Sequence, residues 1–280
     1  MTIELIPLRG KNTLTDFVDK EKPFCICDFY LEGCEKGVVH PDHIKYEGIL
    51  NIDHHAPRPE FKKYISSTNM AISYVKKNGT PNIPIIINHT DCDSILSSHI
   101  MNGYFAPEDI WGEAAIAADH TGIQNDIADL LQATQEVNDW RYSCQELLRL
   151  LEGNPYEPRT QQLLQKRQDE RNQAKMLVPS FKYDGNIAYC SLDTRVDSAF
   201  LPPELPNAQV ILLGIPMSNG KLEVKVRLGL HAQNIDLNAL NLPDFGGRWN
   251  AGSTKRVGGT NYTLTEYAAL MKEKVDKLSQ

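Results

Sequence analysis

The sequence predicts an α/β protein with a mostly parallel sheet and flanking helices in its N-terminal domain, a helical connector, and a smaller α/β domain at the C-terminus. Short apolar runs alternate with helical segments up to about residue 120. The next fifty residues are polar, rich in Gln and helical in pattern. Alternating strand patterns return after residue 180. Strands that alternate with helices need crossover connections, which produce parallel pairing. We therefore expect domains at 1–125 and 180–280, joined by a connector at 126–179.

The first domain contains three apolar runs that are each followed by an acid or a histidine. They predict buried strands at 24–29, 48–52 and 84–87. Helices are expected at 66–77, 94–101 and 107–118. Ser66 is a suitable N-cap, and Pro107 suits a first helical turn.

The second half begins with a long charged helix, expected at 161–175, that could bridge two domains. Strands are expected at 182–192 and 209–216. Residues 221–230 alternate between apolar and polar side chains, which is typical of a strand with one buried face. Gly246-Gly247 predicts a tight turn.

Charge and composition exclude several classes of protein. The 280 residues carry 29 Lys and Arg against 36 Asp and Glu, a formal net charge of −7, so long nucleic acid is not the expected partner. No apolar run reaches the roughly 18–20 residues of a membrane-spanning helix, and we expect no membrane partner. The six cysteines are scattered, and the first residues lack a secretory pattern. We expect a cytoplasmic protein with reduced thiols.

Four segments rich in carboxylates and imidazoles follow the apolar runs. They are Asp28, Asp53-His54-His55, the 89–93 segment and Asp119-His120. The carboxyl ends of parallel strands meet at one sheet edge, so these side chains should converge. Such a group would repel itself without a cation, and Asp oxygens with His nitrogens suit Mn²⁺, Mg²⁺ or Fe²⁺. Two such ions about 3.5–4 Å apart are the usual arrangement for in-line attack on phosphorus.

These motifs resemble the DHH phosphoesterases, a family named for the tripeptide found here at 53–55. Residues 88–94 (NHTDCDS) match the family's first motif, and Asp28 matches its second motif. Ser66-Ser67-Thr68 matches the turn that follows DHH, and residues 118–122 (ADHTG) match the fourth motif, Asp-Thr-Gly. His120 is an insertion in the fourth motif. The strand at 224–228 and the glycine-rich run at 245–252 resemble the family's associated substrate domain.

The order of the motifs departs from the family. The family runs first motif, second motif, DHH, fourth motif, whereas here the first motif follows DHH. Strand ends converge whatever the order of the strands in the chain, so a rearranged connection can still assemble the same site.

The resemblance implies a role for each residue. Asp28 would bridge two ions, His89 and Asp91 would complete one metal site, and Asp93, His54 and Asp119 would complete the other. Asp53 would orient a histidine, and His55 would contact the phosphate or protonate the leaving oxygen. Substrate binding would come from Arg227, Gly246, Gly247, Arg248, Asn250 and Gly252.

The expected function is a metal-dependent phosphoesterase that uses two Mn²⁺ or Mg²⁺ ions to hydrolyse a small phosphorylated or nucleotide substrate. A short oligonucleotide, a cyclic dinucleotide product and a nucleotide phosphate stay open as substrates, and a homodimer stays open as the assembly. The alternatives are a non-catalytic nucleotide sensor on the same fold, an inorganic pyrophosphatase-like hydrolase, and a metal-dependent hydrolase of another bond.

Overall fold

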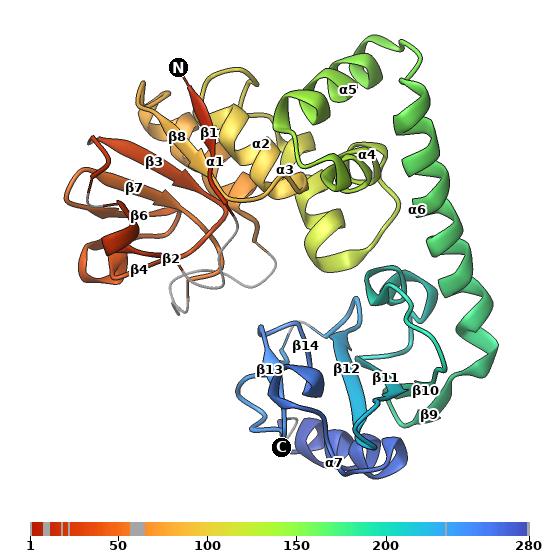
Figure 1. Cartoon of the computed structure of the whole chain (residues 1–280). Coiled ribbons are helices and arrows are strands. Elements are labelled where there is room, and N and C mark those ends of the chain that lie inside the picture. The colour runs from red at the N-terminus through yellow and green to blue at the C-terminus, as the bar shows by residue number, and fades with distance from the viewer. Residues whose placement is uncertain are drawn as a thin grey trace. The chain divides into compact units, whose positions relative to one another are not determined.

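The computed structural model describes residues 2–7, 12–17, 19–21, 23–56, 65–232 and 234–278. The chain divides into two compact units, shown in Figure 1. Unit 1 comprises Met1–Asp119 and Gln124–Gln165. Unit 2 comprises His120–Ile123 and Lys166–Gln280.

A six-stranded sheet of unit 1 has the order β1-β8-β3-β7-β6-β5. The bounds are β1 Ile3–Leu5, β8 Ile85–Ile87, β3 Phe24–Cys27, β7 Ile49–Ile52, β6 His43–Tyr46 and β5 Val38–His40. The first four strands are parallel, whereas β6 and β5 are antiparallel additions. The predicted fold class is thus confirmed, and β1 and the β5–β6 pair are strands that the sequence did not predict. A small parallel pair, β2 (Asn12–Thr13) and β4 (Leu31–Glu32), also forms.

The position of β3 in the middle of the sheet explains why its sequence is apolar without alternation. Cys25 and Cys27 face one hydrophobic cluster, whereas Phe24 and Ile26 face another. Because a parallel strand that is buried on both faces has no solvent-exposed face, its residues are apolar on both sides. The strand ends at Cys27 rather than at Phe29, and Asp28 comes next. All six cysteines of the chain are buried and form no disulfide.

Helices α1 (Ser67–Asn78) and α2 (Cys92–Met101) pack against each other and supply much of the first cluster. Ser66 caps α1 through a reciprocal bond with Asn69. The remaining helices of this region are α3 (Asp109–Ile116), a π-helical turn (Ala117–Thr121), α4 (Asp126–Thr134) and α5 (Trp140–Glu152). The predicted helix 107–118 therefore ends in a π-helical turn.

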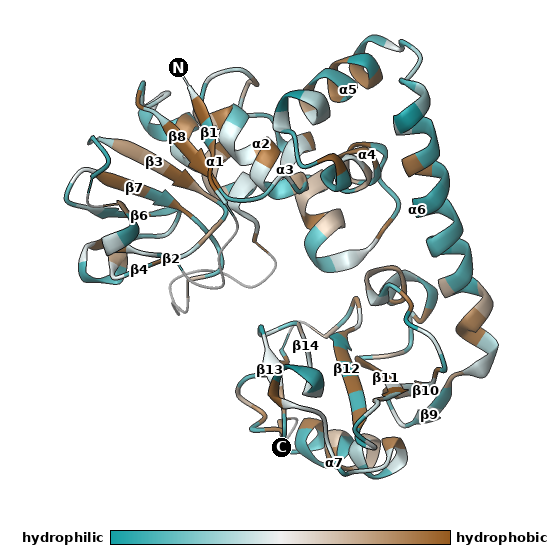
Figure 2. Cartoon of the chain, viewed as in Figure 1, coloured by the Kyte–Doolittle hydropathy of each residue, from teal (hydrophilic) through white to brown (hydrophobic). Residues whose placement is uncertain are grey.

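Helix α6 (Pro158–Leu177) passes from unit 1 to unit 2, with the change between Gln165 and Lys166. Figure 2 shows hydrophilic residues along most of it. Within the described ranges, no helix has both the length and the apolar character that crossing a bilayer requires.

Unit 2 is built on a second six-stranded sheet of order β13-β14-β12-β11-β10-β9. The bounds are β13 Gly246–Gly247, β14 Ala251–Ser253, β12 Leu222–Leu228, β11 Val210–Pro216, β10 Ile187–Ser191 and β9 Lys182–Asp184. Helix α7 (Leu264–Asp276) packs on one face. The expected single strand 182–192 is wrong, because Gly185 (φ 62°) turns the chain into the β9–β10 hairpin.

Candidate active site

Asp28 lies at the centre of the candidate site, directly after β3. Its backbone is left-handed (φ 62°), and its amide donates to the carbonyl of Ile52 at 2.9 Å. The carboxylate is buried and accepts hydrogen bonds from two serine hydroxyls, Ser67 on Oδ1 and Ser94 on Oδ2, both at 2.8 Å. Serines from α1 and α2 therefore fix this side chain, and the bond to Ile52 fixes its backbone.

Three imidazoles surround the same carboxylate. His89 Nε2 lies 3.1 Å from Oδ2, whereas His55 Nδ1 and His54 Nε2 lie 3.7 and 3.8 Å from Oδ1. Burial disfavours the charged carboxylate, but the hydrogen bond to His89 and the neighbouring positive charges hold the pKa of Asp28 well below its usual value. The carboxylate is thus an anion in a buried site.

His54 is oriented by the main chain. Its Nδ1–H donates to the carbonyl of Ile65 at 2.7 Å, which points Nε2 toward the carboxylates. Nε2 lies 3.3 Å from Asp119 and 3.6 Å from Asp93. Burial lowers the pKa of His54, but the hydrogen bond to Asp119 and the nearby negative charges raise it to about 10. This position strongly favours positive charge.

Asp93 is fully buried and caps α1 from another helix. Its Oδ2 accepts the backbone N–H of Ser67 at 2.7 Å. Its Oδ1 accepts the N–H and the hydroxyl of Thr68 at 2.7 and 2.6 Å. Burial and the charges of Asp28 and Asp119 raise its pKa well above the usual value. Both oxygens that would ligate a cation are therefore also engaged by the N-terminus of α1.

His89 and Asp91 form a second arm of the site. His89 Nε2 lies 3.2 Å from Asp91 Oδ2, and its Nδ1 bonds to Asn88 Oδ1. Burial lowers the pKa of His89, but Asp91 and Asp28 raise it to about 11. Asp91 also caps α2 by accepting the N–H of Ser94 at 3.0 Å, so α2 starts two residues before the expected position.

Asp53 and His55 form a dyad. His55 Nδ1–H donates to Asp53 Oδ1 at 2.7 Å, and Asp53 Oδ2 accepts the N–H of Ala56 at 3.0 Å. Asp53 is buried, whereas His55 is half-buried. The His55 ring lies edge-on to the His54 ring, with 4.2 Å between ring centroids. The dyad thus holds a partly accessible imidazole beside Asp28.

The predicted catalytic and metal residues therefore form one network of contacts no longer than 3.8 Å. Its members are Asp28, Asp53, His54, His55, His89, Asp91, Asp93 and Asp119. Of the ligand groups with all members in unit 1, Asp28–His54–His55 and Asp28–His89–Asp91 each bring three ligand atoms within 4.8 Å of one another, and both use Asp28. Asp119 enters the network from a π-helical turn, a distortion that is frequent at functional sites.

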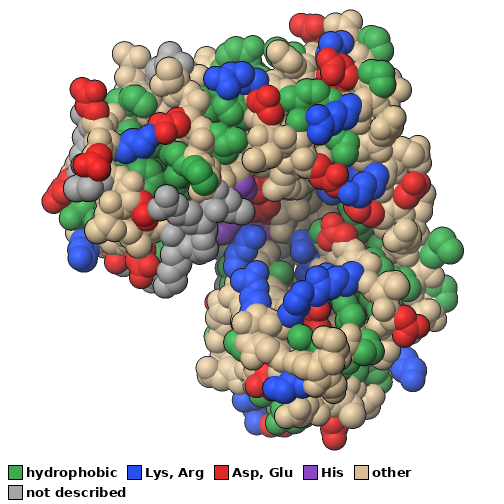
Figure 3. All heavy atoms as spheres, in the orientation of Figure 1, with side chains coloured by type: hydrophobic (Ala, Val, Ile, Leu, Met, Phe, Trp, Pro, Cys, Tyr) green, Lys and Arg blue, Asp and Glu red, His purple; other side chains and the backbone are tan. Residues whose placement is uncertain are grey.

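The predicted substrate residues lie together in unit 2. Gly246 and Gly247 form β13, Gly252 lies on β14, and Arg227 pairs with Ala251 across β12 and β14. The turn between β13 and β14 contains Arg248 and Asn250, and Arg248 N–H donates to the Ala251 carbonyl at 2.7 Å. We name residues 246–252 the glycine-rich loop. Figure 3 shows Lys and Arg side chains gathered on the visible face of this unit.

Close backbone packing explains the glycines of this loop. A Cβ on Gly252 would lie 2.4 Å from the Phe245 ring and 2.7 Å from the carbonyl oxygen of Gly246. A Cβ on Gly247 would lie 2.4 Å from the carbonyl oxygen of Ala251. Neither position accepts a side chain without displacement of the loop.

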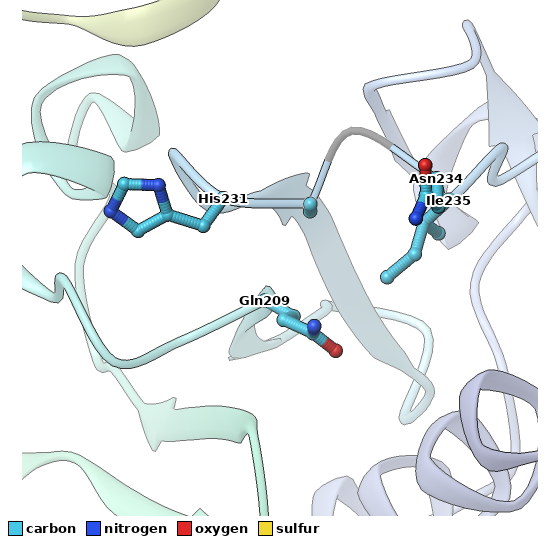
Figure 4. Close-up of a pocket in the computed structure, with 5 residues that line it drawn as sticks. Gln209, His231, Asn234 and Ile235 are labelled. Atoms are coloured by element: carbon cyan, nitrogen blue, oxygen red, sulfur yellow. The ribbon is translucent and has the colours of Figure 1, made fainter. Parts of the chain in front are cut away.

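Unit 2 also contains a cavity of about 280 Å³ lined by Gln209, His231, Ala232, Asn234 and Ile235. Figure 4 shows Asn234 and Ile235 across the cavity from His231. The described residues that line it include no carboxylate, so it lacks the donor set of the unit 1 network.

Several contributors to the site were not assigned a role from the sequence. Ser67 and Ser94 donate to Asp28, and the Ile65 carbonyl orients His54. The serines gave a signal, because each lies in the first turn of a helix next to a motif. A carbonyl gives none, since every residue has one.

Comparisons with known proteins give distant structural matches. No protein-family model matches the chain, and a search of curated proteins found no match. The chain is similar to a pGpG-specific phosphodiesterase, PggH from Vibrio cholerae, with 11% identity, a TM-score of 0.44, and coverage of 84% of this chain and 81% of that one. It is similar to an exopolyphosphatase-related protein from Bacteroides fragilis, with 17% identity, a TM-score of 0.42, and coverage of 95% and 76%.

A third similar structure is the exonuclease RecJ bound to manganese, with 10% identity, a TM-score of 0.33, and coverage of 85% of this chain and 66% of that one. All three are members of the DHH family, the family that the sequence motifs resemble.

Proposed function

We propose that the chain is a DHH-type phosphoesterase that hydrolyses a small phosphorylated or nucleotide substrate with two divalent cations, Mn²⁺ or Mg²⁺. The observation that carries this proposal is the shared position of Asp28 in two ligand triads. A carboxylate common to two cation positions is the arrangement that a two-metal phosphoryl site needs.

The residues fit divalent cations in three respects. The donors are Asp oxygens and His nitrogens, which suit Mn²⁺ and Mg²⁺ better than a thiolate set does. The main-chain bond at His54 Nδ1 selects Nε2 as the ligand atom. The pKa values of His54 and His89, raised to about 10 and 11, show that both positions favour positive charge.

Each part of unit 1 then has a chemical task. His89 and Asp91 would hold one ion with Asp28, and His54 and Asp119 would hold the other. When bound, the ions would supply positive charge to the phosphoryl oxygens and lower the pKa of a water molecule. Asp93 would keep α1 and its serine in place beside His54.

The Asp53–His55 dyad supplies proton chemistry. Asp53 accepts the Nδ1–H of His55, which fixes the orientation of the imidazole beside Asp28. An imidazolium at that position could protonate the leaving oxygen. In unit 2, Arg227 and the N–H groups of the glycine-rich loop would bind the phosphate or nucleotide portion.

A panel of substrates tests the proposal. The purified chain would be assayed with Mn²⁺ or Mg²⁺ on dinucleotides, trinucleotides, cyclic dinucleotides, nucleotide phosphates and pyrophosphate, with EDTA as the metal-free control. We expect metal-dependent hydrolysis of at least one nucleotide. Asp119→Asn should abolish it, whereas the same change at exposed Asp109, outside the network, should not.

The panel also separates the alternatives. Nucleotide binding without turnover would indicate a sensor, and turnover of pyrophosphate alone would indicate a pyrophosphatase-like enzyme. Failure to bind either metal would contradict the proposal.

A further inference from the structure

The segment His120–Ile123 belongs to unit 2, although the residues before and after it belong to unit 1. The chain enters unit 2 directly after Asp119 and returns to unit 1 at Gln124. Asp119 contacts His54, whose imidazole also lies near Asp28. The entry point is therefore one peptide bond away from Asp119, one of the proposed metal ligands.

The start of this segment is bound to the glycine-rich loop. His120 Nδ1 lies 2.9 Å from the side-chain amide nitrogen of Asn250, and both residues are buried. With that amide donating, Nδ1 is the acceptor. The His120 ring also packs against Trp249, with 5.6 Å between ring centroids. A hydrogen bond and a ring contact thus join His120 to two neighbouring loop residues.

The end of the segment also makes specific contacts within unit 2. The Gly122 carbonyl accepts a hydrogen bond from Arg171 at 2.9 Å, and the buried Arg171 guanidinium lies 4.6 Å from the Phe200 ring centroid. Gly122 has φ 66°, and a Cβ there would lie 1.8 Å from the Ala199 carbonyl oxygen. Only glycine fits, so the segment cannot slide within unit 2 without losing these contacts.

We infer that His120 is a positioning residue that couples the glycine-rich loop to Asp119. The inference rests on the proposed function, which gives Asp119 and the loop their roles. A displacement of the loop would move Asn250 and Trp249, and His120 would move with them because it contacts both. Asp119 precedes His120 in the chain, so its carboxylate would move as well. Coupling is reciprocal, so cation binding in unit 1 should alter the surroundings of Trp249.

The experiment uses the full chain labelled with 5-fluorotryptophan and observed by ¹⁹F NMR. The chain has three tryptophans, and Trp249→Phe assigns the relevant resonance. Mg²⁺ alone is the probe, because it is diamagnetic and needs no knowledge of the substrate. We expect the Trp249 resonance to shift as Mg²⁺ saturates the protein, and calorimetry would measure the Mg²⁺ affinity in parallel.

His120→Ala should abolish the shift while the Mg²⁺ affinity changes by less than about threefold, well below one factor of ten. His120→Gln should restore part of the shift, because its amide oxygen can accept from Asn250. If His120→Ala fails to fold, His120→Phe keeps an aromatic ring against Trp249 but removes both ring nitrogens, and with them the acceptor of the Asn250 bond. The matched control is His231→Ala, which removes an exposed imidazole of the same unit and should leave the shift unchanged.

The outcomes separate the two proposals. If the wild-type chain binds no Mg²⁺, the proposed function is wrong and the coupling with it. If Mg²⁺ binds but Trp249 does not respond, or responds equally in His120→Ala, the coupling is wrong and the metal site stands.

Discussion

The proposed metal centre of unit 1 and the glycine-rich loop of unit 2 are built by different means. In unit 1, ionisable side chains are buried or half-buried, and specific hydrogen bonds orient them, as the Ile65 carbonyl orients His54. In unit 2, the loop is shaped by backbone packing, with glycines where Phe245 and neighbouring carbonyl groups approach. Substitutions in unit 1 should therefore change metal binding and kcat, whereas those in the loop should change KM.

The largest expected effect comes from Asp28→Asn. Asparagine tolerates the left-handed backbone at this position and keeps the size of the side chain, so the fold should persist. Loss of the charge removes the ligand common to both triads. We expect turnover to fall on the order of 10³-fold or more and Mn²⁺ binding to be lost. Steady-state kinetics and calorimetry would measure both, and Mn²⁺ binding at wild-type affinity would exclude Asp28 as the shared ligand.

A second prediction concerns a histidine of unit 1 that lies outside the network. His99 is buried, donates Nδ1–H to the Ile95 carbonyl at 2.7 Å, and packs against Trp140. Burial lowers its pKa to about 4, opposite in direction to His54. Its contribution to stability is complete above the unfolded pKa near 6.5 and is lost as the pH falls toward 4, by about 3 kcal/mol in total.

Urea unfolding of the metal-free protein between pH 7 and pH 4 would measure this loss. His99→Gln should flatten the pH dependence in that range. An unchanged slope would show that the imidazole is hydrated or charged in the folded state.

The smallest expected effect is that of Gly252→Ala in the glycine-rich loop. The added methyl group would meet the Phe245 ring and the Gly246 carbonyl, so the loop must shift. We expect KM to rise roughly tenfold, with kcat and Mn²⁺ affinity within about threefold of wild type. Phe245→Leu added to Gly252→Ala should recover part of the loss, because it relieves one of the two contacts. A fall in kcat with KM unchanged would place the loop's contribution in the chemical step.

In unit 1, the strands that the sequence predicted are those buried on both faces. β3 and β8 are continuous apolar runs, β7 is apolar except for Asn51, and polar residues at the ends of all three marked the site. β1 has only three residues, and β5 is half-exposed at the sheet edge, so neither has a distinctive pattern.

Within the site, the sequence predicted which residues converge but not how their atoms are used. Asp93 caps α1 by accepting from Ser67 and Thr68, which precede it in the chain by 26 and 25 positions. This contact depends on how the two helices pack. The same applies to His54, whose partner is a carbonyl group. Pairings of this kind are set by tertiary packing, which a local pattern does not encode.

The position of β3 has a wider consequence. It lies between β7 and β8 in the sheet, although both follow it in the chain. The three segments that follow these strands, Asp28, Asp53–His55 and His89–Asp93, are therefore spatial neighbours however the polypeptide is threaded through them. The order of such segments in a gene could therefore change without altering the site that they form. A search based on which strands are neighbours in the sheet would find a rearranged chain, whereas a sequence pattern that requires a fixed motif order would miss it.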